Sequence, residues 1–165
     1  MSFRPSVSHS LMVSTALASV MLLVMGVCFL VIGYQNPAPG QRKVFFAAGA
    51  LALGLLIGSL AFRIRSYEMS GGNLIVKVGF GEKLFPLTGL EKVEITEAPF
   101  SGAWRTLGVG GLWSYYGRFR SAQLGAFRAY ATSSASGVLL VWPDKKVLIT
   151  PQEPEQFLQA MKAWQ

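Results

Sequence analysis

The side chains best suited to binding chemistry in this sequence are four arginines in and beside a stretch rich in glycine and aromatic residues: Arg105, Arg118, Arg120 and Arg128. Guanidinium groups bind phosphates and carboxylates, and the indole rings of Trp104 and Trp113 suit the boundary between lipid headgroups and hydrocarbon. Arg118 and Arg120 are two positions apart, so they would share one face of a strand. We expect this segment to face anionic lipid or a protein partner. The alternative is a solvated basic strand face with the aromatic rings in the core.

Residues that could support catalysis are few and scattered. His9 and Cys28 are the only histidine and the only cysteine, which is too few for a zinc site or a nucleophilic triad. The glycines at residues 108–111 match neither the Walker motif nor the dinucleotide-binding motif. The acidic residues show no spacing that indicates an acid–base pair. We therefore expect no enzymatic activity, no metal and no cofactor.

Two long apolar runs would position the arginines. Residues 11–33 and 44–62 contain no charged side chain, and helices of these lengths would each cross about 30 Å of hydrocarbon. A core helix is the alternative, but a domain of about a hundred residues cannot enclose two helices that are apolar on every face. A signal peptide would have a shorter apolar run and a cleavage site. The sequence predicts a transmembrane helical hairpin at 11–62, after an N-terminal tail at 1–10.

Basic residues flank the predicted hairpin. Arg63 and Arg65 come directly after the second run and would lie at the membrane surface as further lipid-facing or partner-facing candidates. The distribution of basic residues favours a cytoplasmic location for both termini by a small margin. The formal net charge is +7. Because the lysines and arginines are dispersed, this charge fits anionic lipid better than nucleic acid.

Small residues recur at every fourth position of the second run: Ala50, Gly54 and Gly58. This spacing lets two helices approach closely. It predicts packing against the first helix of the same chain or, as the alternative, contact with a second copy or a partner subunit.

The pattern of residues 63–165 changes to an alternation of apolar and polar side chains bounded by glycines. Such alternation is typical of short antiparallel strands. We expect seven or eight strands in a meander that curls into a sandwich or barrel. One hairpin would turn at Gly71 and Gly72, and a long loop would occupy residues 98–117.

A single amphipathic helix should end the chain. Thr150, Pro151 and Glu153 have the spacing of an N-cap, a first-turn proline and a capping-box acid. The apolar side chains that follow on one helical stripe would cover the open end of the sheet: Phe157, Leu158, Met161 and Trp164.

In order along the chain, these features resemble those of the bacterial pleckstrin-homology-like (PH) domain proteins, and the resemblance covers essentially the whole chain. It consists of two apolar helices and a series of short motifs: Gly72-Asn73-Leu74, Phe85-Pro86-Leu87, Arg105 with Gly108, Gly117-Arg118-Phe119, Tyr130-Ala131-Thr132 and Ile149-Thr150-Pro151. The resemblance implies a seven-stranded, strongly bent antiparallel sheet or barrel capped by a C-terminal helix, and no common enzymatic function. The first hairpin offers only Lys77 and Lys83, not the basic cluster that eukaryotic members use to bind inositol phosphates.

We therefore expect a non-catalytic PH-like module that is anchored in the inner (plasma) membrane of a bacterium. It would mediate protein–protein contact or self-association at the membrane surface, with weak contact to anionic lipid. One alternative is a sensor that binds lipid or a small ligand in the loop at 98–117. The other is an enzyme of unknown type.

Overall fold

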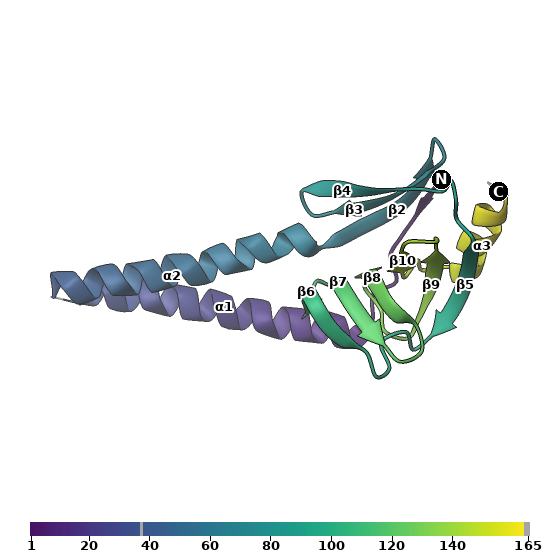
Figure 1. Cartoon of the computed structure of the whole chain (residues 1–165). Coiled ribbons are helices and arrows are strands. Elements are labelled where there is room, and N and C mark those ends of the chain that lie inside the picture. The colour runs from purple at the N-terminus through teal and green to yellow at the C-terminus, as the bar shows by residue number, and fades with distance from the viewer. Residues whose placement is uncertain (37, 164–165) are drawn as a thin grey trace.

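The computed structural model describes residues 1–36 and 38–163 and shows a long helical hairpin attached to a two-sheet domain (Figure 1). The hairpin consists of α1, His9–Gln35, and α2, Pro39–Ser59, which continues into the short 3₁₀ helix η1, Leu60–Phe62. The connection between the helices is shorter than the gap between the two predicted spans, residues 34–43, because α1 ends at Gln35 and α2 begins at Pro39. Pro39 begins α2, a position where its missing amide proton removes no helical hydrogen bond.

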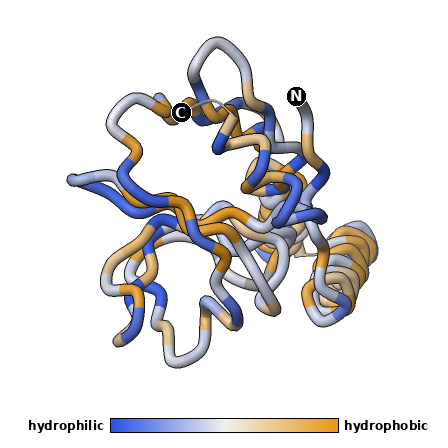
Figure 2. Tube along the Cα trace, turned by 90° about the vertical axis from the view of Figure 1, so that its right-hand side faces the viewer, coloured by the Kyte–Doolittle hydropathy of each residue, from blue (hydrophilic) through white to orange (hydrophobic). Residues whose placement is uncertain are grey.

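Both helices of the hairpin are long and apolar enough to cross a membrane. Only 11% of the most apolar window of the first helix and 17% of that of the second are buried in the structure. Figure 2 shows the coils of the hairpin mostly in the hydrophobic colour, beside a domain in which both colours occur. This exposure excludes a pair of core helices enclosed by the domain.

The two helices contact each other through glycines other than those of the predicted stripe. Gly49 of α2 lies against Leu30, and Gly26 of α1 lies against Leu53. Gly54 and Gly58 are exposed, and an added Cβ at either would meet nothing within 4 Å; Ala50 is exposed as well. The prediction that the stripe Ala50, Gly54 and Gly58 packs against the first helix is wrong, because this stripe lies on a face of α2 that α1 does not cover.

The first sheet contains four strands in the order β1-β2-β3-β4. They are β1, Ser2–Phe3; β2, Ile64–Ser70; β3, Asn73–Val78; and β4, Gly81–Pro86. The turn predicted at Gly71 and Gly72 is confirmed, and both glycines have positive φ angles, 56° and 72°. The N-terminal tail is part of the domain, because β1 pairs with β2 and Ser6 donates a backbone hydrogen bond to Thr150.

The second sheet contains six strands in the order β5-β9-β10-β8-β7-β6. They are β5, Lys92–Glu97; β6, Trp104–Leu112; β7, Ser114–Ser121; β8, Gly125–Ala131; β9, Ser136–Val141; and β10, Lys146–Ile149. β10 pairs in parallel with β8, which a meander does not allow. The described residues thus form ten strands in two sheets, and the expectation of a single seven- or eight-stranded meander is wrong.

The prediction of a long loop at 98–117 is also wrong, because β6 and the start of β7 occupy most of this segment. Gly108 of β6 and Gly117 of β7 are paired, with φ angles of 115° and 141°. A Cβ on either glycine would collide with the backbone of the other strand. The glycines that suggested a loop are therefore what lets two strands lie unusually close together. The sensor alternative loses the loop in which its site was placed.

The main core lies between the two sheets and is closed by α3, Pro154–Lys162. The predicted burial of Phe157 and Met161 is confirmed, with 0% and 1% exposure, whereas Leu158 is only half-buried. Trp164 lies outside the described residues. The structure therefore contains the predicted C-terminal helix with its apolar stripe on the core.

The predicted cap of this helix is wrong. The N-cap is Glu153, whose side chain makes no capping hydrogen bond, and Pro154 is the proline of the first turn. Pro151 instead forms a β-bridge with Pro5. Thr150 is fully buried, where its Oγ1 accepts a 2.8 Å hydrogen bond from the backbone N–H of Thr132. The threonine thus contributes to the core rather than to the helix end.

Candidate functional site

A groove of about 330 Å³ opens on the inner face of the second sheet, beyond the edge of the main core. Its lining contains five basic side chains. Arg118 and Arg120 come from β7 and Arg128 from β8, while Lys145 lies in the turn before β10 and Lys146 is the first residue of β10. We call this the basic groove. It brings together three of the arginines singled out in the sequence and adds two lysines that the sequence analysis missed.

Strand pairing explains why these side chains converge. Arg118 is directly opposite Arg128 across β7 and β8, and Val147 pairs with Arg128 from β10. Tyr116 and Tyr130 are each two positions from these arginines on the same strands. Their rings meet edge to face with the centroids 5.1 Å apart. The core therefore ends at the tyrosine pair, and the same sheet face continues outward as the basic groove.

The basic side chains of the groove form no ion pairs within the part of the chain that the structure describes. The ion pairs among the described residues are Lys77–Glu68 and Lys92–Glu94, and neither involves the groove. Lys146 Nζ donates a 2.9 Å hydrogen bond to the carbonyl oxygen of Leu124, and Lys145 Nζ lies 5.1 Å from the centre of the Trp142 ring. Neither lysine forms an ion pair with an acidic side chain in the part of the chain that the structure describes, so the groove suits a ligand with several negative charges.

A second cluster joins the hairpin to the domain around Trp113. The backbone N–H of Trp113 donates to Thr15 Oγ1 of α1 at 3.0 Å, and its indole Nε1 donates to Ser59 Oγ of α2 at 2.9 Å. The guanidinium carbon of Arg63 lies 5.6 Å from the centre of the Trp113 ring. Trp113 has a φ of 63°, which is rare for a large side chain and is maintained by such contacts. A single residue of the domain thus contacts both helices.

Two of the remaining predicted site residues lie outside both clusters. Trp104 pairs with Arg120 across β6 and β7 but is 56% exposed and is not part of the groove lining. Arg105 pairs with Phe119, and its guanidinium lies beside Gly110 of its own strand. Arg65 is exposed on β2 and lines one pocket together with Arg63 and Trp113. The predicted site residues are therefore divided between the basic groove, the junction with the hairpin and the exposed part of β6.

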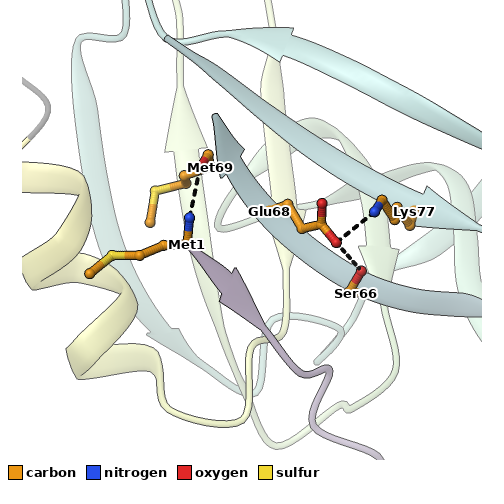
Figure 3. Close-up of polar contacts among 5 residues, drawn as sticks. All are labelled: Met1, Ser66, Glu68, Met69 and Lys77. Atoms are coloured by element: carbon orange, nitrogen blue, oxygen red, sulfur yellow. Dashed lines mark hydrogen bonds and ion pairs between the residues drawn. The ribbon is translucent and has the colours of Figure 1, made fainter. Parts of the chain in front are cut away.

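The first hairpin of the domain has no free basic cluster. Lys77 Nζ lies 2.7 Å from Glu68 Oε1, and the same oxygen accepts a 3.2 Å hydrogen bond from Ser66 Oγ (Figure 3). The hydrogen bond from Lys77 is the main reason that the pKa of Glu68 is lowered. The charge that Lys77 would offer a phosphate is thus already paired.

Neither cluster resembles a metal centre. Across residues 1–36 and 38–163, no three histidine, cysteine, aspartate or glutamate side chains lie together as metal ligands would. The basic groove contains one acidic residue, Asp144, beside Lys145 and Lys146. The chemistry that the arrangement supports is the binding of anions.

Comparison with known proteins agrees with this fold. A family model described as the bacterial PH domain matches residues 65–164. The matched region runs from β2 to the C-terminal helix and leaves out the hairpin. No curated protein and no solved structure matches the chain significantly. With a match over more than half of its length, the chain belongs to the bacterial PH domain family.

Proposed function

We propose that this protein is a membrane-anchored, non-catalytic PH module that binds an acidic segment of a partner protein in the basic groove. The hairpin would be the anchor, since its two helices have the length and the exposed apolar surface of membrane spans. The location would be the inner membrane of a bacterium. The basic residues that flank the spans favour a cytoplasmic domain.

The uncompensated charge of the basic groove is the observation that carries this proposal. Five basic side chains surround one concave space, and the only acidic side chain in its lining is Asp144. A flat bilayer surface contacts protruding groups, whereas a groove accepts an extended chain. Arginines bind carboxylates through two parallel hydrogen bonds. An acidic peptide segment therefore fits both the shape and the charge.

The affinity of such a site would be modest. Each solvent-exposed ion pair contributes about 0–1 kcal/mol, so a segment with several carboxylates is needed. A partner in the same membrane would have a high effective concentration, which compensates for weak contacts. The family match supports a binding role rather than catalysis, because PH domains commonly mediate protein or lipid interaction.

The test is fluorescence anisotropy with the full-length chain in nanodiscs of neutral lipid. The probe is a labelled ten-residue peptide of alternating glutamate and glycine. We expect binding that weakens steeply as salt is raised. The triple variant Arg118→Gln, Arg120→Gln, Arg128→Gln should bind at least tenfold more weakly.

The control removes charge at the far end of the hairpin. Arg42→Gln with Lys43→Gln lowers the net charge without touching the groove and should bind the peptide as the unmodified chain does. If the groove variant and this control lose affinity equally, the binding reflects net charge alone and the proposal fails.

Self-association is the second candidate. The face of α2 with Ala50, Gly54 and Gly58 is free of contact with α1, and such a stripe permits close helix packing in a bilayer. Crosslinking in intact cells distinguishes the two: a product at twice the mass of the chain, lost in Gly54→Leu, would identify a second copy as the partner.

A further inference from the structure

A larger groove, of about 880 Å³, lies where the hairpin meets the domain. Figure 1 shows α1 and α2 close together at the far end of the hairpin and separated toward the domain. The groove is bordered by the first part of α1, by the N-terminal tail and by the start of β2. We call it the junction groove.

One wall of the junction groove is apolar and continues down α1. It includes Leu11, Met12, Ala16 and Val20, and Met12 and Val20 are more than half exposed, at 62% and 59%. Val20 lies nine positions beyond Leu11 in the helix, a distance of roughly 14 Å along the helix axis. That length is close to half of the approximately 30 Å hydrocarbon thickness of a bilayer. The wall thus has the dimensions of one leaflet.

The other side of the junction groove carries positive charge. Arg63 and Arg65 line it, and neither makes an ion pair with any residue in the described part of the chain. Arg63 stacks on Trp113, and stacking leaves the N–H groups of a guanidinium free to donate hydrogen bonds. Two arginines without ion pairs beside an apolar wall are complementary to an anionic headgroup with acyl chains.

We propose that the junction groove holds one anionic phospholipid of the surrounding bilayer, with its phosphate on Arg63 and Arg65 and one acyl chain along Leu11, Ala16 and Val20. This inference rests on the proposed membrane anchoring and is independent of the basic groove. The bilayer is the source of the ligand, because the apolar wall requires acyl chains that a soluble phosphate does not have.

Native mass spectrometry of the full-length chain in detergent tests the proposal, with phosphatidylglycerol and phosphatidylcholine supplied in equal amounts. The expected result is one retained phosphatidylglycerol per chain and little phosphatidylcholine. Arg63→Gln with Arg65→Gln should lower phosphatidylglycerol retention about thirtyfold, because each arginine near an anionic lipid contributes about fivefold. Arg63→Lys with Arg65→Lys keeps the charges and should retain more lipid than the glutamine variant.

Two matched variants test the apolar wall. Ala16→Leu would fill the groove and should abolish retention of the lipid. Ala47→Leu makes the same change at an exposed position of α2 that does not line the groove and should leave retention unchanged. An excess of glycerol 3-phosphate should not displace the lipid. Displacement by it would identify a site for free phosphate instead and would overturn the proposal.

Failure of this inference can be distinguished from failure of the anchor. If alkaline carbonate releases the full-length chain from membranes, the anchor is wrong and the lipid site is wrong with it. If the chain stays in the membrane fraction but retains both lipids equally, or if Ala16→Leu and Ala47→Leu behave alike, the lipid site alone is wrong.

Discussion

The phenolic hydroxyl of Tyr67 on β2 donates a 2.7 Å hydrogen bond to the backbone carbonyl oxygen of Tyr130 on β8. The same hydroxyl accepts a 3.3 Å hydrogen bond from the backbone N–H of Thr150, at the end of β10. Tyr67 is 0% exposed, so water cannot replace these bonds. One side chain of the first sheet therefore connects two strands of the second sheet inside the core.

Tyr67→Phe should lower the free energy of unfolding by about 1–3 kcal/mol, because the Tyr130 carbonyl and the Thr150 amide lose a buried partner. Urea unfolding of the full-length chain in detergent, followed by near-ultraviolet circular dichroism, would measure the change. Tyr34→Phe removes a hydroxyl that is exposed at the end of α1 and should be neutral. Equal midpoints for the two variants would contradict this role of Tyr67.

The same tyrosine should make stability depend on alkaline pH. Burial raises the pKa of Tyr67 from 10.0 to about 12, so the folded state holds the phenolic proton more tightly than the unfolded state. Its contribution is complete below pH 10 and declines as pH rises toward about 12. The variant Tyr67→Phe has no phenolic proton at this position, so the stability that Tyr67 loses above pH 10 should not be lost in this variant. Unfolding midpoints collected between neutral pH and pH 11 would show it, and parallel profiles would refute it.

Gly79→Ala should loosen the contact between the domain and the end of α2. The backbone N–H of Gly79 donates a 2.7 Å hydrogen bond to Arg63, and an added Cβ would collide with the backbone of Leu60 and Ala61. We expect a loss of about 1–3 kcal/mol in stability, as for other overpacked sites. Gly81→Ala is the matched control, since its Cβ would meet nothing within 4 Å. Thermal unfolding in detergent would compare them, and equal melting temperatures would count against the close contact.

Trp113→Phe should weaken the junction while leaving the fold intact. The substitution removes the indole N–H that donates to Ser59 Oγ, at a cost of about 1 kcal/mol. We expect faster cleavage near residue 63 in limited proteolysis of the detergent-solubilised chain. Trp104→Phe changes an indole that is 56% exposed and should leave the cleavage rate as it is. A cleavage rate that is unchanged in Trp113→Phe would mean that this bond does not hold the junction.

Thr150→Val should cost about 1–3 kcal/mol, since the buried amide of Thr132 would lose its acceptor. Glu153→Ala should cost little, because the Glu153 side chain makes no capping bond. Urea unfolding of both variants separates a core threonine from a capping box. The opposite order of effects would restore the capping box that the sequence suggests.

Features that depend on neighbouring residues could be predicted from the sequence. The alternation in β2 and β3 and the glycines between them fix a hairpin locally, and the uncharged runs identify both long helices. Phe157 and Met161 are correctly predicted as core because four residues of helix bring them to one face. In each case the deciding interactions lie within a few positions of one another.

Features that depend on distant partners could not be predicted in this way. β1 has only two residues, and it is a strand because it pairs with β2, more than sixty positions further along the chain. Thr150 matches a helix cap locally, but Thr132 and Tyr67 determine its role. Lys145 and Lys146 join the basic groove only because β10 pairs in parallel with β8. The adjacent lysines before a predicted strand were the one local signal that could have indicated them.

The chain leaves the domain at Ser8 and returns at Arg63, and both points are bonded to it: Ser8 to Thr132, and Arg63 to Gly79. A module on a single flexible tether can swivel over the bilayer and sample many orientations. With both ends of the hairpin fastened, this domain keeps one orientation relative to its helices. If the hairpin spans a bilayer as we propose, a tilt of its helices in a thinner bilayer would therefore rotate the whole domain and change which face it presents to the membrane surface.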